Sequence, residues 1–179
     1  MPKIKQLTSK VVYQNKWMSV REDTIKRPSG AQGIYGVVDK PDFVVIAAIE
    51  DDCIHLVQQY RYPVEGRYWE MPQGTWESNH NPDPLELARG ELQEETGLIA
   101  HKMEQVAHQY LAYGFCSQGY YVYLATELVK TQNKLDPEEE DLITKKFTLA
   151  EFEQMILSGE IKDATTVNAY GLLKLKKLL

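Results

Sequence analysis

Long hydrophobic runs, cysteine clusters and an excess of positive charge are all missing from this sequence of 179 residues. No apolar segment is long enough to span a membrane and no signal peptide opens the sequence, so no membrane partner is expected. The 2 cysteines, Cys53 and Cys116, form no metal-binding pattern. Together with the missing signal peptide, they favour a reduced, cytoplasmic setting.

The formal net charge is −6, which argues against broad classes of partner. Nucleic-acid binding needs a basic surface, so we expect no nucleic-acid partner. Because the overall field also repels phosphate, a phosphate-bearing substrate must be attracted by local cations.

The order of apolar and turn residues predicts one main α/β domain with a small β-strand region before it. The sequence has no internal repeat, and 179 residues can bury one sizeable core. We expect residues 1–40 to form an N-terminal β appendage that dimerises, and residues 41–179 to form the main domain. Strands are expected at 10–14, 17–26, 34–38, 43–50, 53–60, 69–71, 103–111, 120–126 and 142–147, and helices at 83–97, 148–159 and from 163 to the C-terminus.

The helix near the middle of the chain has clear start and stop signals. Asp83 is typical of an N-cap, Pro84 suits the first helical position, and Glu86 stands where a capping box needs an acidic residue. Gly97 is placed to end the helix in a left-handed conformation.

Glu91, Glu94 and Glu95 occupy positions i, i+3 and i+4 of this helix, so we expect their carboxylates to crowd together. One interpretation is a solvated acidic face. The other is a metal site, because no lysine or arginine is interspersed and a proline-glycine turn ending at Gly74 precedes the helix. Hard divalent cations such as magnesium prefer several oxygen ligands and keep some of their waters.

The run from Gly90 to Leu98, read with Gly74 upstream, resembles the signature of the Nudix hydrolases. That signature has glycine, five residues, glutamate, seven residues, and then arginine-glutamate-apolar-x-glutamate-glutamate-x-glycine-apolar. The C-terminal half matches. Before it, the spacing from Gly74 to Glu91 is two residues longer, Pro82 stands at the first glutamate, and Gly90 stands at the arginine that orients a metal-binding glutamate in the family.

Segments 58–63 and 69–74 are similar to the ADP-ribose pyrophosphatase branch of this family, as are the 114–117 loop and the 121–126 strand. The resemblance implies a Nudix-type α/β/α sandwich with a mixed β-sheet. It also implies a homodimer built by the N-terminal strands, with the substrate partly across the interface. Tyr113 departs from the branch, which has a proline in that region, and resembles some diadenosine polyphosphate hydrolases.

The resemblance gives the glutamate helix a metal-binding role. Glu91 and Glu95 would hold magnesium, which manganese can replace, with Glu94 as a further ligand or as the base. The main-chain carbonyl of Gln73 would complete a site. Metal ions so held would neutralise a diphosphate and lower the pKa of a bound water.

Other site residues are expected outside this helix. In this branch, a loop before a C-terminal strand supplies a catalytic glutamate. Glu140 aligns best with that residue, and Glu139 is the next candidate. The alternative is that this acidic loop is simply exposed to solvent, as such loops usually are. Arg61 is expected to bind phosphate oxygens bidentately, the alternative being a surface ion pair, and Arg67 is a weaker candidate. Four aromatic residues are candidates for stacking on a base: Trp17, Tyr35, Trp76 and Tyr113. The alternative is that they are core or interface residues, as aromatic residues in strands and loops more often are.

These residues predict a magnesium-dependent hydrolase of a nucleoside diphosphate derivative. The resemblance implies ADP-ribose or another nucleotide sugar as substrate, with a nucleoside monophosphate and a sugar phosphate as products. One alternative is a catalytically impaired Nudix domain that binds a nucleotide without hydrolysis. Another is a hydrolase of dinucleoside polyphosphates or NADH.

Overall fold

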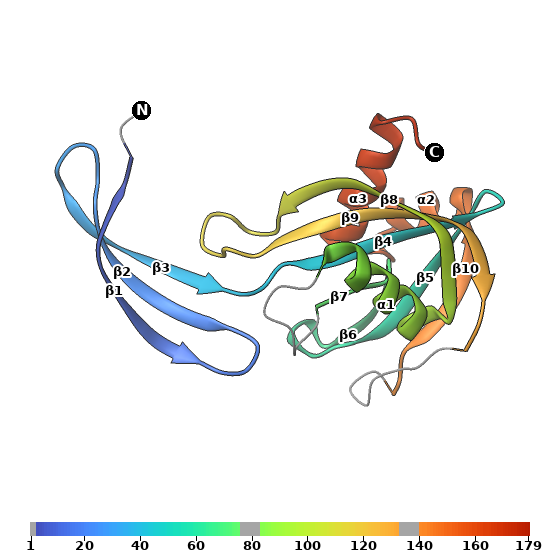
Figure 1. The fold of residues 1–179 in the computed structure, drawn as a ribbon, viewed down its shortest axis with the longest axis horizontal. Helices are drawn as coiled ribbons and strands as arrows, with labels where there is room; N and C mark the ends of the chain where they lie inside the picture. The colour runs from blue at the N-terminus through green and yellow to red at the C-terminus, as the bar shows by residue number, and fades with distance from the viewer. Residues whose placement is uncertain (1–2, 76–82, 133–139) are drawn as a thin grey trace. The chain divides into compact units, whose positions relative to one another are not determined.

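The computed structural model describes residues 3–75, 83–132 and 140–179. Within it the chain forms two compact units (Figure 1). The first contains residues 1–42 and 109–120, and the second contains residues 43–108 and 121–179. No helix in these described ranges is long and apolar enough to cross a membrane.

The first unit contains a three-stranded antiparallel sheet in the order β1-β2-β3. Its strands are β1 (Lys5–Gln14), β2 (Ser19–Lys26) and β3 (Gln32–Asp39). A tight turn leads into β3, in which Gly30 has a φ of +90° and its N–H donates to the Arg27 carbonyl at 2.9 Å. β1 is exposed along its whole length, so this small sheet leaves apolar side chains on its surface.

The second unit contains a seven-stranded sheet in the order β10-β5-β4-β9-β8, with β6 paired to β5 and β7 paired to β4. Its central strand, β4, is strongly apolar and largely buried, and it lies where the sequence predicts a strand at 43–50. Asp51 and Asp52 have φ values of 50° and 57°, and they form the tight turn between β4 and β5. The strands are β4 (Phe43–Glu50), β5 (Cys53–Arg61), β6 (Gly66–Glu70), β7 (Gln73–Gly74), β8 (Leu98–Tyr110), β9 (Gly119–Lys130) and β10 (Ile143–Thr148).

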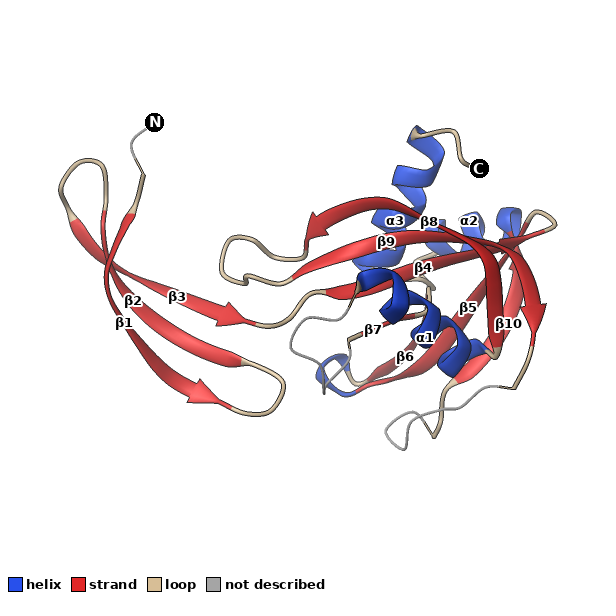
Figure 2. Ribbon diagram, viewed as in Figure 1, coloured by secondary structure: helices blue, strands red, loops and turns tan. Residues whose placement is uncertain are grey.

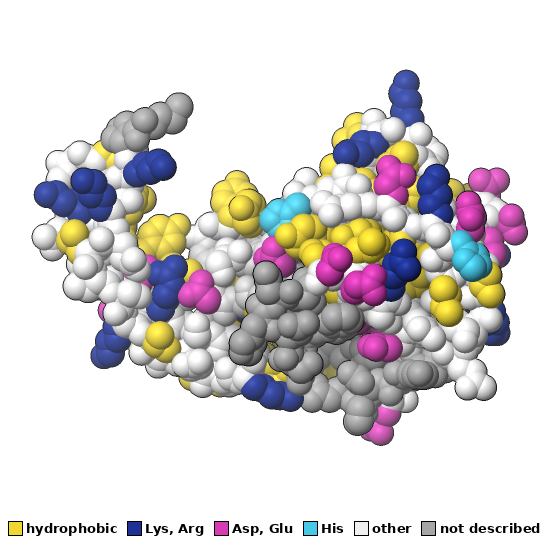
Figure 3. All heavy atoms as spheres, in the orientation of Figure 1, with side chains coloured by type: hydrophobic (Ala, Val, Ile, Leu, Met, Phe, Trp, Pro, Cys, Tyr) yellow, Lys and Arg dark blue, Asp and Glu magenta, His cyan; other side chains and the backbone are white. Residues whose placement is uncertain are grey.

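Three α-helices, α1 (Pro84–Thr96), α2 (Leu149–Leu157) and α3 (Ala164–Leu175), and one short 3-10 helix, η1 (Tyr62–Val64), are present in the described residues. Figure 2 shows α1 on one face of the seven-stranded sheet and α2 and α3 on the other. This is the α/β/α sandwich that the sequence predicts, and the separate N-terminal sheet is also as expected. On the face shown in Figure 3, hydrophobic side chains gather over β8 and β9, with acidic side chains beside them.

The ends of α1 follow the sequence signals, with one exception. Asp83 accepts a hydrogen bond from the Leu85 N–H at 3.0 Å, and Gly97 ends the helix with a φ of 67°. The predicted capping box is wrong: Glu86 lies 3.9 Å from the Arg89 Nε, one turn along its own helix. An exposed i, i+3 ion pair therefore takes the place of the reach back to the N-cap.

The inner face of α1 is covered by the main hydrophobic core. Val44, Ile46 and Ala48 of β4 pack with Leu87 and Leu92 of α1, and all are at most 3% exposed. Burying these side chains contributes roughly 1.5–3 kcal/mol for each large aliphatic one. The core therefore holds the glutamate helix rigidly against the sheet.

Several boundaries differ from the sequence expectation, and two of the differences have a clear backbone cause. β8 begins at Leu98, five residues before the predicted start, because the left-handed Gly97 turns the chain directly from the helix into the strand. α3 ends at Leu175 instead of continuing to the C-terminus, since Lys177 has a φ of 58° and cannot continue a right-handed helix.

Candidate active site

The Glu91 carboxylate lies directly against the backbone of Gly74. A Cβ atom built on Gly74 would come within 2.4 Å of Glu91 Oε2 and 2.6 Å of Oε1. Glu91 is 6% exposed, so α1 directs a charged group inward at this position. Glycine at the end of β7 is thus what lets the α1 carboxylate approach the strand.

Glu95, one helical turn later, is fully buried. Its Oε2 accepts a hydrogen bond from the Gln73 N–H at 3.1 Å, and its main-chain carbonyl accepts one from the Thr144 hydroxyl at 3.0 Å. Gln73 is itself held in place because β7 pairs with Val45 of β4. Gln73 and Gly74 of β7 therefore contact both buried carboxylates of α1.

The third glutamate, Glu94, is half-buried. Among the described residues, no group of three or more His, Cys, Asp or Glu side chains is arranged so that it could hold a metal ion without some movement. Glu91 lies against Gly74 and Glu95 accepts from the Gln73 N–H, so the two carboxylates contact neighbouring residues of the same strand.

Arg61, the predicted phosphate ligand, is bound to a glutamate that the sequence analysis did not select. Its Nε and Nη2 atoms both contact the Glu70 carboxylate, which also lies 3.4 Å from Gln59 Nε2. Glu70 is 3% exposed, and burial raises the pKa of its carboxyl while the Arg61 guanidinium acts in the opposite direction. The ion-pair alternative for Arg61 is therefore observed, but with a buried partner.

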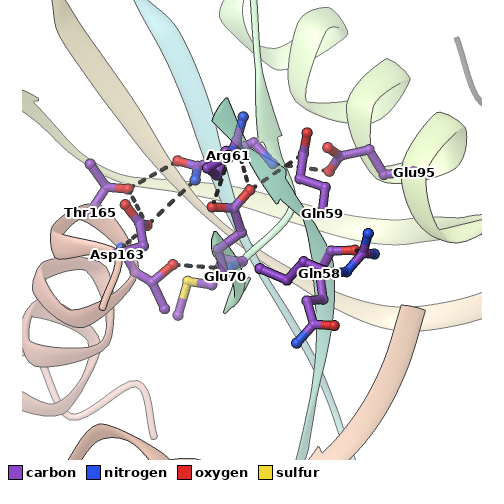
Figure 4. Close-up of polar contacts among 11 residues, drawn as sticks. Gln58, Gln59, Arg61, Glu70, Glu95, Asp163 and Thr165 are labelled. Carbon is purple, nitrogen blue, oxygen red and sulfur yellow. Dashed lines mark hydrogen bonds and ion pairs between the residues drawn. The ribbon is translucent and has the colours of Figure 1, made fainter. Parts of the chain in front are cut away.

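A polar network continues from this pair to the start of α3 (Figure 4). The side chain of Gln73 lies 3.4 Å from Asp163 Oδ2 and 2.9 Å from the Thr165 hydroxyl. Asp163 also caps α3 by accepting from the Thr166 N–H at 2.8 Å. Gln73 thus contacts two helices: its backbone N–H donates to Glu95 of α1, and its side chain hydrogen-bonds residues at the start of α3.

Arg67 and Glu140 lie in neighbouring segments. Arg67 forms an ion pair with Asp141, and its Nη2 also donates to the Asp141 carbonyl at 2.6 Å and the Gln58 carbonyl at 3.2 Å. Glu140 is exposed and directly precedes Asp141. Arg67 therefore anchors the segment that carries Glu140, whereas Glu139 lies outside the described residues.

The first unit holds the aromatic candidates that the structure describes. Tyr113 is 83% exposed, and the Tyr35 hydroxyl donates to the Gly114 carbonyl at 2.7 Å. Trp17 lines a shallow hollow of about 310 Å³ together with Lys40, with the Lys16 ammonium 4.2 Å from the centre of its ring. Trp76 falls outside the described ranges.

Sequence reasoning missed Glu70, Asp163 and Thr165 as members of this polar network. The sequence did contain a signal for Glu70, which lies between Trp69 and Met71 in an apolar strand. A carboxylate buried at such a position needs a hydrogen-bonding or ion-pair partner. The sequence indicates only that Asp163 begins a helix. A helix-cap signal does not reveal that its side chain also contacts Gln73 of β7.

The donor set suits a hard divalent cation. Glu91, Glu94 and Glu95 offer carboxylate oxygens, and two of them are buried where an uncompensated charge is costly. Magnesium keeps several of its waters and needs only one or two carboxylates directly, so a preformed group of three is not required. The chemistry and the burial of these glutamates therefore fit a divalent cation such as magnesium.

Comparison with known proteins defines the class. Residues 40–169 match the NUDIX domain family, and residues 4–38 match the nucleoside diphosphate sugar hydrolase N-terminal domain. The chain thus belongs to the Nudix family of pyrophosphohydrolases, whose members generally use a divalent metal ion.

Individual relatives cover nearly the whole chain. The ADP-ribose pyrophosphatase of Bacillus subtilis and the methanol dehydrogenase activator of Bacillus methanolicus are each 29% identical over 177 residues, or 98% of this chain and 95% of theirs. The ADP-ribose pyrophosphatase of Mycobacterium tuberculosis is 31% identical over 163 residues, 90% of this chain and 78% of its own. A solved structure described as an ADP compounds hydrolase shares the fold, with a TM-score of 0.84 at 22% identity, covering 97% of this chain and 92% of that one.

Proposed function

We propose that this protein hydrolyses the diphosphate bond of a nucleoside diphosphate sugar, with ADP-ribose as the leading candidate. The observation that carries the proposal is the pair of buried carboxylates, Glu91 and Glu95, held against the Gln73–Gly74 strand. The match of residues 4–38 to a nucleoside diphosphate sugar hydrolase domain supports this substrate class. The names of two relatives support ADP-ribose within it.

In this proposal Glu91 and Glu95 would hold magnesium, for which manganese can substitute, and the Gln73 carbonyl would complete the site. The bound metal would neutralise the diphosphate and lower the pKa of a bound water. Glu94 acts either as a further ligand or as the base. The packing of α1 on β4 keeps these groups in fixed positions, so little reorganisation is needed when the substrate binds.

The proton of the attacking water needs an acceptor within hydrogen-bond reach. We assign this role to Glu94 or Glu140, with Glu139 as the remaining candidate of the acidic loop. Arg61 and Arg67, which are paired with Glu70 and Asp141, are our candidates for donating hydrogen bonds to the phosphates, which the net charge of −6 does not attract. Tyr113 is our candidate for contact with the substrate outside these charged groups.

The products follow from the chemistry of the diphosphate bond. Attack of water on one phosphorus breaks the P–O–P bridge, and the departing phosphate takes the bridging oxygen. From ADP-ribose this gives AMP and ribose 5-phosphate, with the water's proton taken by the base. No further reactant is required.

The test is release of nucleoside monophosphate from ADP-ribose, ADP-glucose, NADH and a dinucleoside polyphosphate, with and without magnesium. We expect magnesium-dependent AMP release that is fastest with ADP-ribose. Glu91→Gln and Glu95→Gln should each abolish turnover while the circular dichroism spectrum is kept. Glu86→Gln is the matched control, since Glu86 is an exposed glutamate of the same helix. Unchanged turnover in both buried-site variants would contradict the proposed metal site.

A nucleotide-binding protein without hydrolysis is the second candidate, and the glycine at position 90 favours it. That residue stands where the family has its arginine, and the methanol dehydrogenase activator is as similar to this chain as one of the pyrophosphatases. Saturable binding of ADP-ribose with no product from any compound of the panel would support this candidate.

A further inference from the structure

The Arg61–Glu70 pair is asymmetric. The Arg61 side chain is 39% exposed, whereas that of Glu70 is 4% exposed. The two residues lie on adjacent antiparallel strands, β5 and β6, where Glu70 is opposite Val57 and Gln59 is opposite Tyr68. Because side chains alternate along a strand, Arg61, Gln59 and Glu70 share one face of the sheet.

Stability alone is a weak reason to place a carboxylate here. Moving Glu70 out of water carries a desolvation penalty, which an ion pair often does no more than offset. Burial raises the pKa of Glu70, the direction expected of a desolvated carboxyl, although the Arg61 guanidinium opposes this. A hydrophobic side chain between Trp69 and Met71 would extend the core without that penalty.

The geometry of the contact indicates what the pair achieves instead. Glu70 engages the Nε and Nη2 atoms of Arg61, which form one edge of the planar guanidinium. Within the described part of the chain, the third nitrogen, Nη1, has no hydrogen-bond partner. A guanidinium fixed along one edge still presents donors along another, and a planar fork of donors suits phosphate oxygens.

We propose that Glu70 is a positioning residue: it holds the Arg61 guanidinium so that its remaining edge meets a phosphate of the substrate. This inference rests on the proposed function, because it takes a diphosphate as the ligand. Glu70 contacts no substrate atom itself. The Arg61 side chain is long and two-fifths exposed, so it would lose conformational entropy when it binds a phosphate. Glu70 restricts its rotation before the substrate arrives and so lowers this cost.

Gln73 connects the same arrangement to the carboxylate helix. The Gln73 side chain hydrogen-bonds Glu70, and its backbone N–H donates to Glu95 at 3.1 Å. The side chain also contacts Asp163 and Thr165 at the start of α3 (Figure 4). Arg61 is thus positioned by groups that also position the helix with the proposed metal ligands.

The experiment compares steady-state kinetics of wild type, Glu70→Gln and Glu70→Asp with ADP-ribose and saturating magnesium. We expect Glu70→Gln to raise KM by about tenfold with kcat changed by less than about threefold, since a lost binding orientation affects KM first. Glu70→Asp keeps the charge but is shorter, so it should raise KM by an intermediate factor. Glu65→Gln is the matched control, because Glu65 is an exposed carboxylate in the turn between β5 and β6.

A double-mutant cycle tests whether Glu70 acts through Arg61. In an Arg61→Gln background, Glu70→Gln should change KM by less than about twofold, because the group it positions is gone. Effects that simply multiply would overturn the proposal. So would a lower melting temperature with an unchanged KM, or a failure of both Glu70 variants to fold, since either result would indicate a purely structural role.

Failure of the proposed function would look different. In that case the wild-type protein would release no product from any compound of the panel. If wild type turns over and Arg61→Gln raises KM while Glu70→Gln does not, only the positioning role falls.

Discussion

Glu91 and Gly74 are in such close contact that no larger residue than glycine fits at position 74 without moving the carboxylate. The nearest carboxylate atom would lie 2.4 Å from a Cβ at this position. Gly74 is not among the described glycines with positive φ, so its backbone conformation is open to other residues. The need for glycine here is therefore one of space, and it comes from a residue 17 positions later in the sequence.

The first prediction is that Gly74→Ala lowers turnover strongly without unfolding the protein. The added methyl group must displace the Glu91 carboxylate, and a shift of about 1 Å at a catalytic group costs up to about 100-fold in rate. Steady-state kinetics and circular dichroism check this. Gly171→Ala is the control, because a Cβ at Gly171 in α3 meets nothing within 4 Å. That variant should keep full activity and gain about 0.5–1 kcal/mol of stability. Wild-type kinetics in Gly74→Ala would show that the carboxylate position is unimportant.

This contact illustrates what the sequence can and cannot predict. The local signals at Asp83 and Gly97 give the ends of α1 correctly, because caps depend on neighbouring residues. The apolar run of β4 and the position of the buried glutamates follow from periodicity. The α/β/α layers and the N-terminal sheet were also predictable, since the family resemblance implies them.

The remaining features depend on contacts between distant residues. Glu70 pairs with Arg61 across two strands, and Gln73 reaches Asp163, which is 90 positions away. No local pattern encodes such pairs. The surroundings of Glu91 and Glu95 are of the same kind: helical spacing places the Cα atoms, but the strand beside them determines which groups each carboxylate contacts.

The second prediction is a homodimer built by residues 1–40. Leu7, Val11 and Val12 of β1 are between 46% and 54% exposed, and a three-stranded sheet is too small to bury them itself. Light scattering at micromolar concentration should give twice the chain mass of 20.6 kDa. Val12→Lys should shift the protein toward monomer, whereas Val129→Lys, at a similarly exposed valine of β9, should not. A monomer mass for the wild type would contradict the dimer, and a substrate site shared across it would fall as well.

The third prediction concerns His55 and pH. Burial, assisted by the nearby Lys146 ammonium, lowers the pKa of this imidazole below its usual 6.5, despite Glu50 Oε2 at 3.9 Å. The unfolded chain therefore binds a proton near pH 6.5 that the folded chain does not, so stability falls as the pH drops below that value. One such proton contributes a slope of at most about 1.4 kcal/mol per pH unit.

His55→Gln should make the loss of stability between about pH 7 and pH 5 less steep, because the titrating group has been removed. Urea unfolding at several pH values in this range measures the slope. His101→Gln is the control, since His101 is an exposed histidine of β8. An equal slope in wild type and His55→Gln would show that another group accounts for the acid sensitivity.

The fourth prediction concerns Gly90, which is half-buried in α1 where the family signature has arginine. Glycine within a helix costs up to about 1 kcal/mol relative to alanine, so both Gly90→Ala and Gly90→Arg should stabilise α1. Only the arginine variant adds a cation beside the glutamates, and we expect it alone to raise kcat/KM at limiting magnesium. A magnesium titration of kcat/KM for the two variants separates helix propensity from charge. Lower efficiency of Gly90→Arg at every magnesium concentration would mean that another group fills this space. The chain would then have replaced the family's arginine by a different arrangement.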